Sequence, residues 1–299
     1  MGANHESRNE PIVVAVDGSE SASAAVVWAA RAAQASSRPL RIVTVVHIPG
    51  FYYSEPYLAE SFRDELEESG RANLADAKKL AQQTAGPGVN VTTEGHRGRV
   101  ANTLVELSKT ARMVVLGSRG HGEFTGLVVG STAVAVLSHA ESPVVVVRGR
   151  TVDGAPPNDG PIVVGVDGSE QSEAATAVAF EEASVRDVEL VAVHVWSDVS
   201  VQPSLGAVPE DPHWNRIQAE EELVLSERLA GYRERYPDLS VRRMVERDRP
   251  VRVLSGFAEE AQLIVVGHRG RGGLAGMLLG STSNALVHTA DCPVMVVRA

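Results

Sequence analysis

PIVVAVDGSE at residues 11–20 is an apolar run that ends in an Asp-Gly-Ser turn, and it returns as PIVVGVDGSE at residues 161–170. Two further stretches repeat with the same offset of 150 residues. GSRGHGEFTGLVVGST from Gly117 matches GHRGRGGLAGMLLGST from Gly267, and SPVVVVR from Ser142 matches CPVMVVR from Cys292. Three matching stretches in one order indicate an internal duplication.

The duplication predicts the domain organisation. A chain of 299 residues has room for two domains of ordinary size, each with its own core. We expect residues 1–10 to form a disordered tail, residues 11–150 the first domain and residues 161–299 the second. Residues 151–160, TVDGAPPNDG, are rich in Pro, Gly and Asp and are expected to link the two domains.

Each half alternates short apolar runs with helical segments. The expected strands cover residues 12–16, 41–48, 89–94 and 113–116 in the first half and residues 162–166, 189–195, 240–245 and 263–266 in the second, and a Pro-led strand closes each half. Helices are expected to begin near Ser19, Val100, Ser169 and Val251 and to cover about residues 60–85 and 215–236. This pattern predicts an α/β fold of two tandem domains, each a five-stranded parallel sheet with helices on both faces.

Composition excludes several function classes. The formal net charge of -10 argues against a general nucleic-acid binder, because binding a phosphate backbone needs a concentrated basic surface. Neither a run of about 20 apolar residues nor a secretory signal is found, so no membrane association is expected. The single cysteine, Cys292, cannot form an internal disulfide and is expected to be structural. We therefore expect a soluble, cytoplasmic protein.

The glycine-rich stretches carry the chemistry. Their spacing is G-x2-G-x9-G-[ST], with Gly117, Gly120, Gly130 and Ser131 in the first half and Gly267, Gly270, Gly280 and Ser281 in the second. Glycines permit a positive φ and a close approach to a ligand, and the N-terminus of the helix that follows attracts phosphate. Neither copy has the lysine of a P-loop or the G-x-G-x-x-G dinucleotide fingerprint. The alternative is a flexible glycine-rich turn without a ligand.

The paired openings, both glycine motifs and the closing PVVVVR and PVMVVR strands resemble the universal stress protein family, in its tandem two-domain, ATP-binding form. The resemblance covers essentially the whole chain. It implies two Rossmann-like (adenine nucleotide alpha hydrolase-like) domains and one adenine nucleotide in each. It also implies that the closing strands of the two halves pair as an intramolecular pseudo-dimer, and whole chains are expected to form a homodimer.

The resemblance also implies roles for individual residues. The adenosine side would be formed by Ala15, Val16 and Asp17 in the first half and by Gly165, Val166 and Asp167 in the second. Ile48 and Val195 would contact adenine through their backbone, and Leu116 and Val266 would lie near the ribose or base. The phosphates would be held by the motif glycines together with Ser131, Thr132, Ser281 and Thr282. For Asp17 and Asp167 a helix-capping role is the alternative, and the two roles are compatible.

Other polar residues carry weaker signals. Arg119, Arg269, His121 and Arg271 could balance phosphate charge, with an exposed loop cation as an equal alternative. His47 and His194 are interpreted as strand-end histidines satisfied by hydrogen bonds. No histidine spacing predicts a protein-made metal site, although Mg²⁺ could arrive with the phosphates. No catalytic set of Ser, His, Asp or Cys stands out.

The favoured interpretation is an ATP-binding regulatory module of the stress response, with one site per domain. It would act on a regulatory protein partner that the sequence does not identify. The alternatives are a weak ATPase and an interaction scaffold with vestigial nucleotide sites. The absence of an evident general base favours a binder over an enzyme.

Overall fold

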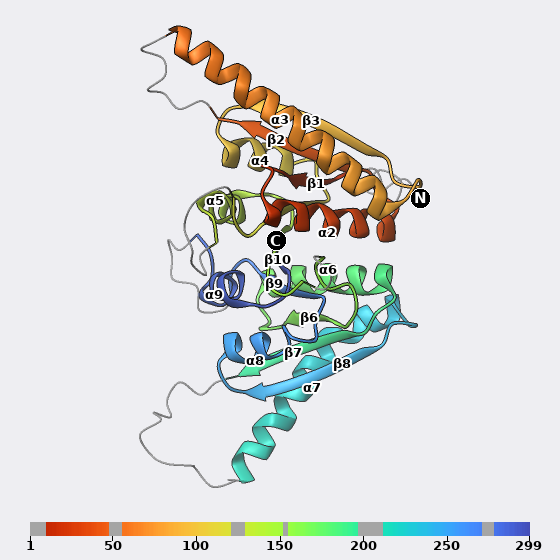
Figure 1. Ribbon diagram of the computed structural model, residues 1–299. Helices are drawn as coiled ribbons and strands as arrows, with labels where there is room; N and C mark the ends of the chain where they lie inside the picture. Colours follow the sequence, from red (N-terminus) through yellow and green to blue (C-terminus); the bar gives the residue numbers. More distant parts are fainter. Residues whose placement is uncertain (1–9, 48–55, 121–128, 152–154, 197–211, 271–277) are drawn as a thin grey trace.

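The computed structural model describes residues 10–47, 56–120, 129–151, 155–196, 212–270 and 278–299 (Figure 1). The first half contains strands β1 (Ile12–Ala15), β2 (Leu40–Val46), β3 (Val91–Arg97), β4 (Met113–Gly117) and β5 (Val144–Val147), with helices α2 (Glu20–Ser36), α3 (Pro56–Ala85), α4 (Val100–Ser108) and α5 (Ser131–His139). The second half contains strands β6 (Ile162–Gly165), β7 (Leu190–Trp196), β8 (Val241–Arg247), β9 (Leu263–Gly267) and β10 (Val294–Val297), with helices α6 (Glu170–Arg186), α7 (Pro212–Arg235), α8 (Pro250–Gly256) and α9 (Ser281–Thr289). The predicted α/β fold is confirmed.

The strands form one sheet that runs through both halves. Its order is β3-β2-β1-β4-β5-β10-β9-β6-β7-β8, and neighbouring strands within each half are parallel. Strands β5 and β10 meet in antiparallel register, with Val144 opposite Val296 and Val146 opposite Val294. The expected pairing of the closing strands is therefore confirmed, and the two halves lie on either side of this seam (Figure 1).

The strand order determines where a ligand can enter. In the first half the chain runs outward through β1, β2 and β3 and then returns to the other side of β1 as β4. Between β1 and β4 the order reverses, and the loops at their carboxyl ends diverge. Strands β6 and β9 form the equivalent crevice in the second half.

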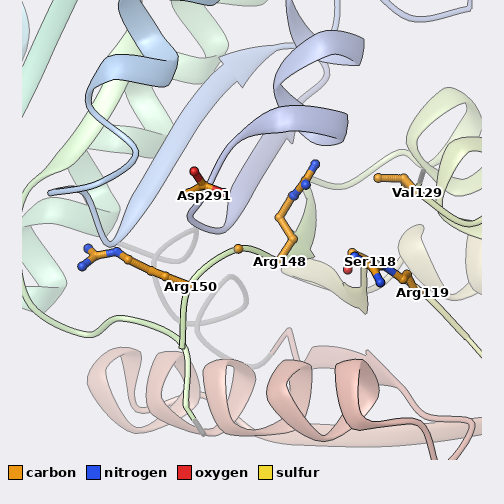
Figure 2. A pocket seen from close by; sticks show the side chains of 7 residues that line it. Ser118, Arg119, Val129, Arg148, Arg150 and Asp291 are labelled. Atoms are coloured by element: carbon orange, nitrogen blue, oxygen red, sulfur yellow. The ribbon is translucent and has the colours of Figure 1, made fainter. Parts of the chain in front are cut away.

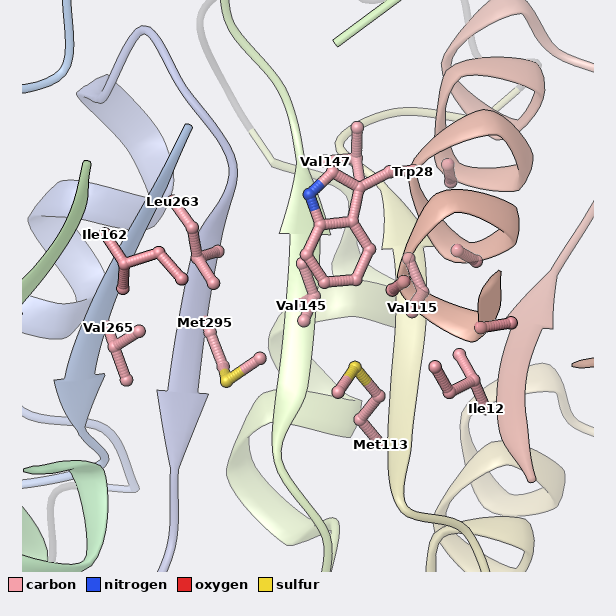
Figure 3. Packing of buried hydrophobic residues seen from close by; sticks show 14 of the residues in the cluster. Ile12, Trp28, Met113, Val115, Val145, Val147, Ile162, Leu263, Val265 and Met295 are labelled. Atoms are coloured by element: carbon pink, nitrogen blue, oxygen red, sulfur yellow. The ribbon is translucent and has the colours of Figure 1, made fainter. Parts of the chain in front are cut away.

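The core is continuous across the seam. The central strands are built from β-branched residues, and Ile12, Val13 and Val14 of β1 are fully buried. Helix α2 packs on them through alanines spaced along one face, which lets the helix lie close to the sheet. Figure 3 shows Trp28, Met113 and Val145 of the first half in one cluster with Leu263 and Met295 of the second.

Helices α2 and α6 meet across the seam through charged and aromatic side chains. Glu181 on α6 pairs with Arg38 at 3.7 Å and with Arg112 at 3.0 Å. The guanidinium of Arg186 lies 4.8 Å from the centroid of the Trp28 ring. Burial, reinforced by Arg112, lowers the pKa of Arg38, and Glu181 opposes this shift. Glu181 therefore balances two arginines of the other half.

This contact is not symmetric. At the offset of 150 residues, Glu181 corresponds to Arg31, and Arg38 corresponds to Val188. Two copies of the first half brought together in this way would place Arg31 against Arg38 and Arg112. The interface charges therefore favour pairing between unlike halves.

Removing the charge of Glu181 tests this interface. We expect Glu181→Gln to lower the free energy of unfolding by about 1–2 kcal/mol, because it removes the carboxylate that pairs with two largely buried arginines. Equilibrium urea unfolding of the full chain measures the change. Glu220→Gln, in the exposed pair with Arg216, is the matched control and should change stability by less than about 0.5 kcal/mol. Equal effects of the two substitutions would contradict the assigned role of Glu181.

Candidate functional site

The turn after the first strand of each half depends on a glycine. Gly18 and Gly168 adopt φ values of 87° and 79°, a region that residues with a Cβ rarely enter. A Cβ on Gly18 would also lie 2.6 Å from Oδ1 of Asn73 on α3. Asn73 donates from Nδ2 to the backbone oxygen of Asp17 at 3.0 Å, so α3 holds the turn in place.

Asp17 supports the start of helix α2. Its Oδ1 accepts hydrogen bonds from the backbone N–H of Ser19 at 3.0 Å and from the Ser19 hydroxyl at 2.6 Å. Ser19 in turn is the N-cap, and its Oγ accepts from the N–H of Ala22 at 3.2 Å. Ser19 is thus the cap of α2, and Asp17 supports it through these two hydrogen bonds.

The second half repeats this arrangement. Asp167 Oδ1 accepts from the N–H of Ser169 at 2.9 Å and from its hydroxyl at 2.6 Å. The hydroxyl of Ser172 adds a bond, since it accepts from the backbone N–H of Asp167 at 3.0 Å. The first half has Ala22 at the position of Ser172 and cannot make this bond.

The first two motif glycines bring the loop after β4 against this turn. A Cβ on Gly120 would lie 2.6 Å from Oδ2 of Asp17, and a Cβ on Gly117 would lie 2.6 Å from the backbone of Ser21. Ser21 Oγ donates to the backbone oxygen of Arg119 and accepts from its N–H. The loop and the N-terminus of α2 are therefore one hydrogen-bonded unit.

The reason that these positions are glycine differs from the sequence prediction. Among the described glycines, φ is positive at residues 18, 86, 98, 149, 160 and 168, and at none of the motif positions. The expectation of a positive φ in the motif was wrong. Gly117 and Gly120 are glycines because their neighbours in the folded chain leave no room for a Cβ, and Gly267 and Gly270 meet Gln171 and Asp167 in the same way.

The third motif glycine opens the last helix of each half. Gly130 is the N-cap of α5 and Gly280 is the N-cap of α9, as predicted. The N–H of Gly130 donates to Ser118 O at 3.0 Å, and that of Gly280 donates to His268 O at 2.9 Å. Because a glycine cap has no side chain, the N–H groups of the first helical turn remain available to an anion.

The remaining predicted residues fall into two environments. The side chains of Val16, Val166, Leu116 and Val266 are at most 7% exposed and belong to the hydrophobic core, so only their main chain can face a ligand. Residues at the edge of the sheet are more open. Ser131 and Ser281 are exposed, and Ala15, Gly165, Thr132 and Thr282 are half-buried.

The predicted adenine positions are not equivalent in the two halves. Ile12 pairs with Leu40 and Ile162 pairs with Leu190, so Val195 of β7 corresponds to Val45 of β2. Ile48 lies outside the described residues. The equivalence of Ile48 and Val195 was therefore wrong, because the loop after these strands offers no repeated landmark from which to set the register.

The histidines next to these strands are satisfied by hydrogen bonds, as interpreted. His194 is 4% exposed, and its Nδ1 lies 2.6 Å from Val166 O while Nε2 lies 3.1 Å from Glu221 Oε2. Thr44 occupies the same position in the first half and donates to Val16 O at 3.0 Å. His47 lies 3.3 Å from Gly98 O through Nδ1.

Further expectations concern cations, metals and the cysteine. Arg119 and Arg269 are exposed, whereas His121 and Arg271 lie outside the described residues. Within the described ranges no group of three or more His, Cys, Asp or Glu residues could hold a metal ion. Burial raises the pKa of the Cys292 thiol to about 12, so it stays protonated and is not a nucleophile. No helix in the described part of the chain is long and apolar enough to span a membrane.

Sequence reasoning missed several contacts between the two halves. The N–H of Val129, next to Gly130, donates to Nδ1 of His288 at 3.2 Å. Arg148 Nη1 donates to Val287 O at 2.6 Å, and Arg298 Nη1 donates to Ser138 O at 3.2 Å. The arginine that closes each PVVVVR or PVMVVR stretch was the available signal, because it recurs at the offset of 150 residues.

Comparisons with known proteins agree with this architecture. The model of the universal stress protein family matches residues 8–148 and 160–298. A universal stress protein of Mycolicibacterium smegmatis is 43% identical over 96% of both chains, and one of Mycobacterium tuberculosis is 44% identical over the same shares. The crystal structure of a universal stress protein from Archaeoglobus fulgidus shares the fold, with a TM-score of 0.69 at 19% identity over 98% of this chain and 97% of that one. The chain therefore belongs to the universal stress protein family and carries its domain twice in tandem.

Proposed function

We propose that this protein is an ATP-binding regulator of the stress response, with one nucleotide site in each half. One observation carries the proposal. In both halves an aspartate turn, two closely packed glycines and a helix N-terminus without a side-chain cap meet where the strand order reverses. This is the place where open α/β sheets bind their ligands.

The parts of the site suit a nucleotide. A carboxylate such as Asp17 accepts hydrogen bonds from ribose hydroxyls or from the adenine amino group. The first-turn N–H groups of α5 and α9, together with the hydroxyls of Ser131 and Ser281, would bind phosphate oxygens. Each hydrogen bond to a charged oxygen contributes about 1.5–3 kcal/mol, so several give useful affinity without a lysine. Mg²⁺ would enter with the phosphates and not through a protein-made site.

Binding without rapid hydrolysis fits these residues best. Asp17 and Asp167 each commit one carboxylate oxygen to two hydrogen bonds with the following serine. Hydrolysis needs a group that orients water opposite the leaving phosphate, and no such group is seen among the described residues of either motif. We therefore propose that nucleotide occupancy acts through conformation and partner choice.

The proposal also covers the assembly and the cellular location of the protein. We propose a cytoplasmic protein that forms a homodimer. Strands β5 and β10 already pair within the chain. Two chains would therefore associate through a surface other than this seam.

Bound nucleotide is the direct test. We expect native mass spectrometry of freshly purified full-length protein to detect adenine nucleotide, and calorimetry of the stripped protein to show two ATP molecules per chain. Absence of both signals would overturn the proposed function and leave the scaffold alternative. Steady ADP release that is lost in Gly130→Ala plus Gly280→Ala would favour the ATPase alternative.

The glycines allow structural and binding effects to be separated. A Cβ on Gly130 meets nothing closer than Ser118 O at 3.9 Å, and its φ of -60° suits alanine. We expect Gly130→Ala to weaken ATP binding about 10-fold or more by crowding the phosphates, with less than about 1 kcal/mol lost from the free energy of unfolding.

Gly117→Ala is the contrasting variant. Its Cβ would collide with the Ser21 backbone, so we expect a loss of about 1–3 kcal/mol in stability whether or not nucleotide is present. Calorimetry and urea unfolding measure the two quantities. Unchanged ATP affinity in Gly130→Ala would place the phosphates elsewhere.

A further inference from the structure

A pocket of about 380 Å³ lies where the first glycine loop meets the second half. It is lined by Ser118, Arg119, Val129, Arg148, Gly149, Arg150 and Asp291 (Figure 2). Ser118 and Val129 lie within the glycine motif of the first half, next to Gly117 and Gly130, and Asp291 precedes β10 of the second. The pocket therefore adjoins one candidate nucleotide site and touches both halves.

The charges of this pocket suit an anion. Three arginines line it against one aspartate. Burial lowers the pKa of Arg148, Asp291 opposes this effect and Arg119 adds to it, yet a guanidinium remains charged in proteins. Figure 2 shows Arg148 between Asp291 and Ser118, whereas Arg150 extends away from them. Arg119 belongs to the glycine loop, and Arg148 lies beside it in the pocket.

Arg148 is anchored to the second half by one hydrogen bond and has another donor without a partner. Its Nη1 donates to Val287 O in the last turn of α9, at 2.6 Å. Its Nε is buried and has no hydrogen-bond partner among the described residues, and the Nε of Arg150 is in the same state. A buried donor without a partner costs free energy, which an anion in the pocket would recover.

The second half has larger side chains at the equivalent positions. His268 stands where the first half has Ser118, and Leu279 stands where it has Val129. His268 is 3% exposed, and burial, with Arg298 and Arg269, lowers its pKa, so its ring is neutral near pH 7. The second half thus has a buried imidazole beside Arg298, at the position where the first half has a serine and the pocket beside Arg148. The two halves therefore differ at the place where the terminal phosphates of a bound nucleotide would lie.

We propose that the pocket beside Arg148 is a phosphate site that serves the first half alone. It would take the terminal phosphates of a nucleotide bound at Gly117–Gly130, or a free phosphate or pyrophosphate. For the first of these ligands, a bound nucleotide, this inference rests on the proposed function. Because Asp291, Val287 and His288 belong to the other half, occupancy would couple the first nucleotide site to the seam.

Arg148→Met and Arg298→Met form a matched pair of variants. Each removes an arginine that donates to a backbone oxygen of the opposite half, but only Arg148 lines the pocket. Calorimetry of the full chain with ATP, AMP and pyrophosphate is the measurement. We expect Arg148→Met to weaken the binding of ATP to one site about 10-fold or more and to leave the affinity for AMP unchanged. Arg298→Met should preserve the ratio of ATP affinity to AMP affinity at both sites.

Ser118→His keeps every arginine and fills the pocket with the residue that the second half uses. It should also lower the affinity for ATP relative to AMP at one site, which guards against misfolding of the Arg148 variant. Loss of pyrophosphate binding in both variants, with ATP affinity unchanged, would identify a free phosphate as the ligand.

The outcomes separate this inference from the proposed function. One outcome is that the protein binds nucleotide, but neither Arg148→Met nor Ser118→His alters the ratio of ATP affinity to AMP affinity or the binding of pyrophosphate. This outcome would overturn the proposed phosphate site and leave the proposed function standing. Pyrophosphate binding that depends on Arg148 in a protein that binds no nucleotide would support the pocket and overturn the function.

Discussion

The antiparallel pairing of β5 with β10 is the contact on which the two-domain arrangement depends. Each strand is only four residues long and almost entirely valine, and alone it would leave an apolar edge of unpaired backbone groups. Pairing them satisfies those groups and joins two five-stranded halves into one sheet. It also brings the end of each closing strand to the last helix of the other half, where Arg148 and Arg298 donate to backbone oxygens.

The repeats made most of the fold predictable. Strands of β-branched residues, Asp-Gly-Ser turns and glycine-led helices each leave a local signature, and all of them recur at one offset. The sequence could not show why the motif residues are glycine, because the atoms that exclude a Cβ, on Ser21 and Asp17, are brought there by tertiary folding. Nor could it set the register after β2 and β7, where the halves no longer resemble each other.

Contacts between segments that lie far apart in the chain were also beyond the sequence. Asn73 comes from the middle of a long polar helix, and nothing in its surroundings marks it as the residue that holds the Asp17 turn. His288 and Glu181 look like ordinary helix-surface residues until the seam places Val129 and two arginines beside them. Substitutions between the halves, such as Ser118 to His268 and Thr44 to His194, gain meaning only when the pseudo-symmetric positions are compared in space.

With its apolar edges joined, the sheet ends at β3 and β8, and these strands have a different character. VTTEGHR and VRRMVER place charged residues along both outer edges. Glu94 pairs with Arg41, and Arg242 pairs with Glu189, so several of these charges are balanced by the neighbouring strand. An approaching strand would have to desolvate them before it could pair with the backbone. These charged edges therefore disfavour the addition of another strand to the ten that the structure describes.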